Sequence, residues 1–83
     1  MSSHIKVRFF ASLAEAVGTA EIFVEASDTQ MLMEVLADRL SADAMQAIQQ
    51  DNVRIAVNQT LIEGLTPLTA SDEVALLPPI TGG

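Results

Sequence analysis

The last residues of the chain are those whose type and spacing could take part in chemistry. The sequence ends Leu77-Pro78-Pro79-Ile80-Thr81-Gly82-Gly83. The two prolines lack an N–H, so they cannot continue a sheet ladder and should stiffen the exit from a preceding strand. The two glycines lack a Cβ and could pass through a channel one backbone wide. The carboxylate of Gly83 is therefore a candidate chemical handle for the active site of another protein, with an ordinary frayed terminus as the alternative.

No other part of the sequence offers a catalytic constellation. The chain has no Cys and a single His, His4, which excludes thiolate metal sites, cysteine nucleophiles and histidine clusters. Asp72 and Glu73 are adjacent, so on a strand they would point to opposite faces and could not share a proton or a metal. No glycine-rich phosphate loop precedes a helix. We therefore expect no self-contained active site, and no cofactor or metal bound by this chain.

Length and charge narrow the classes of function further. A chain of 83 residues with 49% hydrophobic residues is expected to form one small domain. Four basic residues against eleven acidic ones give a net charge of -7, which disfavours nucleic acid and anionic membrane surfaces as partners. An acidic domain can instead be steered toward a basic protein. Because neither a secretory signal nor an apolar run of about 20 residues is present, we expect a cytoplasmic protein.

Hydrophobic periodicity predicts the elements that position the C-terminal segment. Strands are expected over residues 5–10, 20–26, 53–57, 60–62 and 73–77, with short helical stretches over 11–17 and 41–50. Ser27-Asp28-Thr29 contains helix N-cap candidates. An amphipathic helix of about three turns should follow, with an apolar stripe of Leu32, Val35, Leu36 and Leu40. Met31 and Met33 flank this stripe and are expected to fill gaps in the core.

The order of these elements predicts an α+β fold of two layers. A hairpin, a helix laid across the sheet and further strands match a small β-grasp fold with one main amphipathic helix. A ferredoxin-like arrangement is the alternative, but it requires two full helices on one face. We expect residues 1–77 to form the domain and residues 78–83 to form a flexible tail.

Strand alternation also predicts an apolar patch beside the start of the tail. If Ile5, Val7 and Phe9 face the helix, Phe10 points to the opposite face of the sheet. Leu77 points to that same face if its neighbour Leu76 faces inward. Together with Leu61, these side chains would form an exposed patch that could bind a protein partner. The alternative is that the strand ends twist and bury them under loops.

Several motifs resemble the small subunit of molybdopterin synthase, a ubiquitin-like sulfur carrier family. They span most of the chain: Val7-Arg8-Phe9-Phe10-Ala11 with Leu13, Ala56-Val57-Asn58-Gln59, Asp72-Glu73-Val74-Ala75, and Pro78-Pro79-Ile80-Thr81-Gly82-Gly83. The chain departs from the family pattern at two places. Ala70-Ser71 stands where the family commonly has Asp-Gly, and Leu76-Leu77 replaces aromatic residues before the two prolines.

The resemblance implies a ubiquitin-like β-grasp fold and a role as sulfur donor. In the family, an adenylyltransferase related to ubiquitin-activating enzymes uses ATP to activate the terminal glycine, here Gly83. A sulfur-donating enzyme then supplies the sulfur of a thiocarboxylate. The tail enters the large subunit of the synthase, where this sulfur attacks a cyclic pyranopterin. The resemblance thus assigns Gly82 and Gly83 to the reaction and a heterotetramer of two small and two large subunits to the assembly.

Other functions of a chain ending in Gly-Gly stay open at this point. A sulfur carrier for thiamine synthesis shares the fold and the ending, but it tends to be shorter and to lack the Phe-Phe-Ala opening and the two prolines. A sulfur carrier for another metabolite is a second alternative. A ubiquitin-like protein modifier, joined through Gly83 to lysine side chains, is a third.

Overall fold

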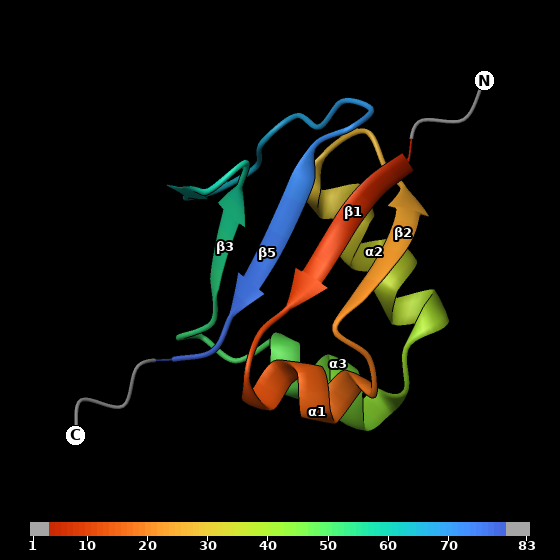
Figure 1. Cartoon of the computed structure of the whole chain (residues 1–83), viewed down its shortest axis with the longest axis vertical. Coiled ribbons are helices and arrows are strands. Elements are labelled where there is room, and N and C mark those ends of the chain that lie inside the picture. Colours follow the sequence, from red (N-terminus) through yellow and green to blue (C-terminus); the bar gives the residue numbers. More distant parts are fainter. Residues whose placement is uncertain (1–3, 80–83) are drawn as a thin grey trace.

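The computed structural model describes residues 4–79. Within these residues, the chain forms a mixed sheet of five strands and three helices (Figure 1). The elements are β1 (His4–Phe9), α1 (Ser12–Val17), β2 (Glu21–Glu25), α2 (Thr29–Arg39), α3 (Ala42–Ile48), β3 (Arg54–Val57), β4 (Thr60–Ile62) and β5 (Glu73–Leu77). Each expected strand and helix is present, with boundaries shifted by a few residues.

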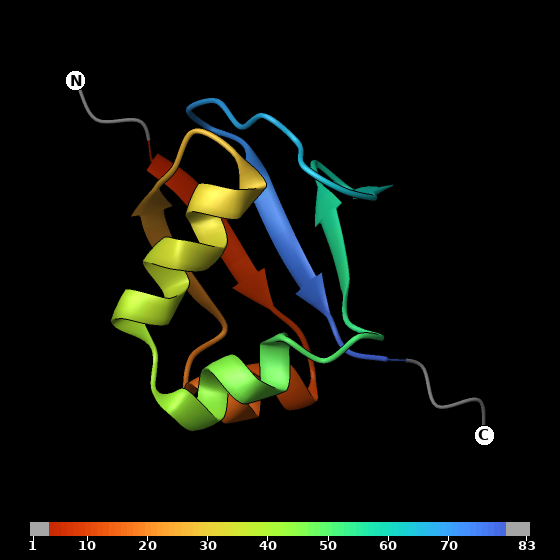
Figure 2. The same cartoon turned by 180° about the vertical axis from the view of Figure 1, so that it is seen from behind.

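The strands lie in the order β2-β1-β5-β3-β4. β1 pairs in parallel with β5, and all other neighbours are antiparallel. The first and last of these strands are therefore side by side within the sheet. Helices α2 and α3 lie on one of its faces, and α1 lies beside α3 at one end of the sheet (Figure 2). The predicted α+β fold with one principal helix, α2, is confirmed, and this strand order excludes the ferredoxin-like alternative.

The alternation of side chains along the central strands separates a core face from an outer face. Ile5, Val7 and Phe9 of β1 are buried beneath the helices, as are Val74 and Leu76 of β5. The helices contribute their own apolar side chains to this core: Leu13 from α1, Leu32 and Leu36 from α2, and Met45 and Ile48 from α3. The predicted inward and outward faces of β1 and β5 are therefore confirmed.

The ends of the helices follow local sequence signals. Asp28 is the N-cap of α2, because its Oδ1 accepts a hydrogen bond from the backbone N–H of Met31 at 2.7 Å. Ser41 caps α3 in the same way, accepting from the N–H of Ala44 at 3.1 Å. Gly18 ends α1 with a φ of 95°, and its N–H donates to the carbonyl oxygen of Ala14 at 2.9 Å.

The prediction that Met31 fills the core is wrong. Met31 is 43% exposed, whereas Thr29, Leu32 and Leu36 are buried along one line of α2. Successive residues of an α-helix are about 100° apart, so Met31 lies on the side of α2 opposite that line. Met33 does pack partly against the core, as expected.

Ser71 occupies a backbone conformation that favours glycine. Its φ is +77°, in the left-handed region that costs an L-residue about 1–2 kcal/mol. We expect Ser71→Gly to raise the free energy of unfolding by about 0.5–1 kcal/mol, with part of the gain offset by the greater freedom of glycine in the unfolded chain. A thermal melt should show Tm higher by roughly 2–8 °C.

Ala70 provides the matched control for this prediction. It is exposed, like Ser71, but its φ is not positive. Ala70→Gly therefore gains nothing in the folded state and should lower stability. Equal effects of the two substitutions would contradict the assignment of strain to Ser71.

Candidate functional site

The outer face of the sheet brings together the three apolar side chains that the sequence predicted to lie there. Phe10, Leu61 and Leu77 line one hollow, which we call the Phe10 hollow. Leu61 is 62% exposed, while Phe10 and Leu77 are half-buried. The remaining lining residues are Arg8, Ala56, Gln59, Glu73 and Ala75. The predicted cluster therefore exists as a spatial arrangement, and its role as an interface stays a prediction.

A second hollow adjoins the first at the start of the C-terminal segment. Leu61 and Leu77 line it too, and Pro78 and Pro79 form its other apolar wall, so we call it the proline hollow. Its polar lining residues are Asn52 and Arg54. Since the two hollows share two side chains, they are neighbouring parts of one surface, which we call the outer-face patch.

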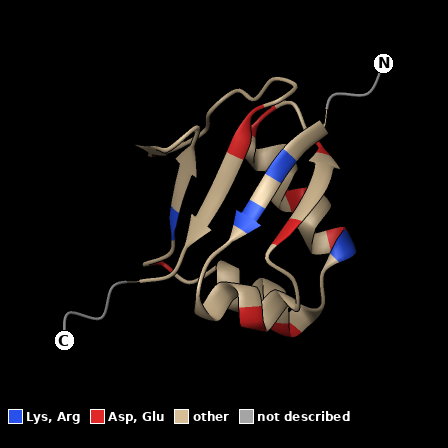
Figure 3. Ribbon diagram, in the orientation of Figure 1, with Lys and Arg blue, Asp and Glu red and all other residues tan. Residues whose placement is uncertain are grey.

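Basic side chains accompany the apolar ones on this face. Lys6 and Arg8 alternate with the buried residues of β1, and Arg54 lies opposite Leu77 in the pairing of β3 with β5. Three of the four basic residues therefore project from the outer face, which is turned toward the viewer in Figure 3. The fourth, Arg39, is at the end of α2 and donates a hydrogen bond to the carbonyl oxygen of Phe23 at 2.9 Å.

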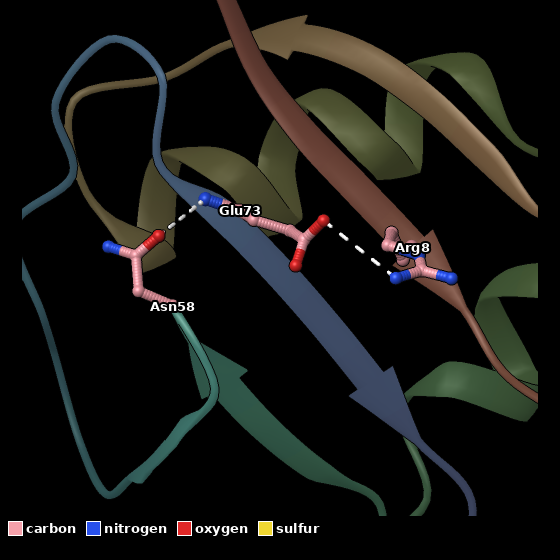
Figure 4. A network of polar contacts seen from close by, with 3 residues as sticks. All are labelled: Arg8, Asn58 and Glu73. Atoms are coloured by element: carbon pink, nitrogen blue, oxygen red, sulfur yellow. Dashed lines mark hydrogen bonds and ion pairs between the residues drawn. The ribbon is translucent and has the colours of Figure 1, made fainter.

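Arg8 explains why Phe10 is only half-exposed. The guanidinium carbon of Arg8 lies 5.0 Å from the centre of the Phe10 ring, a cation–π distance. Its Nη1 is also 3.9 Å from the Oε2 of Glu73, the carboxylate on the neighbouring strand (Figure 4). Both side chains of this ion pair are partly exposed, so we expect it to orient Arg8 more than to stabilise the fold. The predicted exposure of Phe10 is therefore only partial, because Arg8, two residues earlier, lies over its ring.

Asn58 attaches the β3–β4 turn to the strand that leads to the tail. The Oδ1 of Asn58 accepts a hydrogen bond from the backbone N–H of Glu73 at 3.0 Å (Figure 4). The backbone N–H of Asn58 donates to the carbonyl oxygen of Glu73 at 2.7 Å. Its Nδ2 donates to the Oδ1 of Asp72 at 3.0 Å. Asn58 and Gln59 have φ of 51° and 71°, as in the two-residue turn typical of β-hairpins. These hydrogen bonds hold the β3–β4 turn against the start of β5.

Asp72 is held in its ionised form by the same network. Hydrogen bonds from the backbone N–H of Thr69, at 2.8 Å, and from the side chain of Asn58 lower the pKa of Asp72 below its ordinary value of 3.8. The stability contributed by this carboxylate is present above pH 3.8 and is lost as the pH falls through the lower folded-state pKa. We expect the stability difference between the wild type and Asp72→Asn to be constant near neutral pH and to shrink below pH 3.8. Denaturant melts across this range measure it, and a difference that persists at the lowest pH would contradict the assignment.

The described residues offer little catalytic chemistry. Within residues 4–79, no three His, Cys, Asp or Glu side chains are placed to hold a metal ion. A third hollow, near Met31 and Leu68, includes Glu25 but no basic side chain to activate it. In this same part of the chain, no helix is long and apolar enough to cross a membrane. Among the described residues, the outer-face patch brings together the predicted site residues Phe10, Leu61, Leu77, Pro78 and Pro79.

Four of the predicted site residues lie outside the described residues: Ile80, Thr81, Gly82 and Gly83. Pro78 and Pro79 are described, and both line the proline hollow. Sequence reasoning missed Arg54 and Asn52 as members of this site. Arg54 alternates with the inward-facing Ile55, which signals its outer-face position, but its proximity to Leu77 follows from the register of β3 on β5.

Comparison with known proteins identifies the family. Residues 7–83 match the model of the ThiS family. The chain belongs to the ThiS family. It is also 41% identical over 81 residues to the molybdopterin synthase sulfur carrier subunit of Escherichia coli (strain K12), covering 95% of this chain and 99% of that protein. The resemblance inferred from the sequence motifs is therefore confirmed.

Solved structures of other proteins share the fold of this family member. A chain in the complex of subunits 1 and 2 of the molybdopterin-converting factor from Helicobacter pylori 26695 is 31% identical, with a TM-score of 0.72 over 96% of this chain and 99% of that one. The small archaeal modifier protein 1 from Methanosarcina acetivorans is 28% identical, with a TM-score of 0.82 over 100% of this chain and 99% of that one. The expected ubiquitin-like β-grasp fold is confirmed.

Proposed function

We propose that this chain is the sulfur carrier and small subunit of a molybdopterin synthase. The observation that carries the proposal is the 41% identity to the Escherichia coli sulfur carrier subunit across nearly the full length of both chains. The outer-face patch supports it, because a carrier that must present its terminus to another protein needs a docking surface beside that terminus. The patch includes Pro78 and Pro79, directly before the segment that ends in Gly83.

In this mechanism the chain supplies the reacting terminus and its partners supply the catalytic groups. A carboxylate resists substitution because its leaving group would be oxide. An adenylyltransferase joins the Gly83 carboxylate to AMP from ATP and releases pyrophosphate. Sulfur supplied at the sulfide level by a donor enzyme then attacks the carbonyl carbon, displaces AMP and leaves a thiocarboxylate. This sulfur is a soft nucleophile, which the large subunit directs at a cyclic pyranopterin during molybdenum cofactor synthesis.

The residues of this chain have two tasks in that sequence. The outer-face patch docks the domain on the large subunit, so that the terminus is held near the reacting carbon. Pro78 and Pro79 give the tail a fixed direction, and Gly82 and Gly83 let the backbone pass where a side chain would clash. Ile80 and Thr81, between the two prolines and the two glycines in the sequence, are assigned to the contact with the partner.

The absence of cysteine provides a selective test of the thiocarboxylate. Because the chain has no Cys, a terminal thiocarboxylate is its single target for a thiol-alkylating reagent. We expect protein isolated from its native cells to be alkylated at Gly83, as located by mass spectrometry of the C-terminal peptide. Mass alone is less selective, since exchanging oxygen for sulfur adds about 16 Da, as does oxidation of a methionine. Protein with an unmodified Gly83, isolated while the cofactor is being made, would contradict the proposal.

A protein modifier is the second candidate, favoured by the structural likeness to the small archaeal modifier protein 1. A modifier forms an amide between Gly83 and a lysine ε-amino group of a target. The same mass spectrometry distinguishes the two functions, because a modifier would be recovered as peptides branched at lysine. Unbranched, alkylated C-termini support the sulfur carrier.

A further inference from the structure

Two arginines lie at opposite parts of the outer-face patch in a protein that is acidic overall. Arg8 lines the Phe10 hollow and Arg54 lines the proline hollow. The chain has four basic residues and a net charge of -7, so two of its few cations border this one apolar surface. Since Glu73 also lines the Phe10 hollow, the two arginines and this carboxylate give the lining of the patch a net charge of +1, opposite in sign to that of the whole chain.

Arg54 is the more available of the two. It is exposed, and within residues 4–79 its guanidinium has no ion-pair or hydrogen-bond partner. Its strand partner is Leu77, the last residue of β5. Arg8 is engaged by Glu73 at 3.9 Å, but its side chain is still 45% exposed. Both guanidinium groups therefore keep donors that another molecule could use.

A partner that covers the patch must compensate these charges. Docking an apolar surface removes water from the groups beside it, and a guanidinium that loses water without gaining an acceptor destabilises the complex. A carboxylate is a fitting acceptor, because it can bind the planar guanidinium through two parallel hydrogen bonds. Long-range steering by the net charge does not replace this contact, since salt screens charges beyond about 8–10 Å.

We propose that Arg54, assisted by Arg8, selects the partner that binds to the outer-face patch. The surface of that partner inserts an apolar side chain into the patch and carries carboxylates beside this side chain. This inference rests on the proposed function, in which that partner is the large subunit of the synthase. It adds that the large subunit is locally acidic where it contacts Arg54, even though the chain that it binds has a net negative charge.

Charge reversal at matched positions tests the inference. Arg54→Glu, Arg8→Glu and Lys6→Glu change the net charge equally, but Lys6 lines neither hollow. Calorimetric titration with the large subunit from the same organism, at about 50 mM salt, should give a Kd about tenfold or more weaker for Arg54→Glu. Arg8→Glu should weaken binding about threefold, because Glu73 already compensates part of its charge, and Lys6→Glu less than about twofold.

Arg54→Gln removes the charge without reversing it and should weaken binding in the same direction, by a smaller factor. A thermal melt of each variant confirms that the fold is intact. If the wild type binds the large subunit but Arg54→Glu and Lys6→Glu have equal Kd values, this inference is overturned and the proposed function still stands. Failure of the wild type itself to bind the large subunit would overturn both.

Discussion

Deletion of Gly83 abolishes sulfur transfer and leaves the fold unchanged: this is the result we expect from the shortened chain. The reason is that the proposed mechanism places the reacting carboxylate on Gly83, whereas the buried core is formed by residues between Ile5 and Leu76. A new terminus at Gly82 is shorter by one residue, about 3.5 Å of extended backbone. A displacement of about 1 Å can already slow a reaction about a hundredfold, so no measurable transfer is expected.

Two measurements on the shortened chain provide the control. Its thermal melt should match that of the wild type, and its affinity for the large subunit should fall little, because the outer-face patch is unchanged. Transfer activity near that of the wild type would contradict the sulfur carrier function. Loss of binding together with activity would instead show that the tail, and not the patch, provides most of the affinity.

Phe9→Ala should chiefly lower folding stability, whereas Phe10→Ala should chiefly weaken binding to the large subunit. Phe9 is 3% exposed in the core, so its truncation should cost about 3–5 kcal/mol of folding stability. Phe10 is half-buried on the outer face under Arg8, so its truncation should cost about 1 kcal/mol. In binding to the large subunit, however, Phe10→Ala should lose more than about 1 kcal/mol, as an aromatic anchor of an interface does.

A denaturant melt and a binding titration on each variant distinguish these roles. The two residues are adjacent and chemically identical, so each is the control for the other. Equal destabilisation by both substitutions would show that Phe10 belongs to the core. A Phe10→Ala variant that is stable and binds with wild-type affinity would remove Phe10 from the interface.

Local patterns in the sequence were sufficient to predict the elements and the faces of the central strands. The alternation of Ile5, Val7 and Phe9 defines which side of β1 is buried, because successive side chains of a strand point to opposite faces. In the same way, Asp28 and Gly18 mark helix ends through hydrogen bonds to residues three or four positions away. Such features depend on neighbours in the sequence, so the sequence alone specifies them.

Features that depend on strand register could not be predicted in this way. Asn58 contacts Asp72 across 14 residues of sequence, and Arg54 lies beside Leu77 across the β3–β5 pair. Alternation gives the face of a side chain but not its neighbour on the next strand. The covering of Phe10 by Arg8 depends on side-chain conformation, which periodicity does not describe. These are the contacts that turn the predicted apolar patch into one bordered by arginine.

The central position of β5 has a consequence for how the protein is made. β5 lies between β1 and β3, so it joins the β1–β2 hairpin to the β3–β4 hairpin. Its partner β1 was synthesised more than 60 residues earlier, and pairings this distant in sequence form slowly. A chain emerging from the ribosome therefore cannot complete its sheet until the last strand has been released. Because Leu77 of β5 lines both hollows of the outer-face patch, a chain with an unfinished sheet also lacks a complete patch.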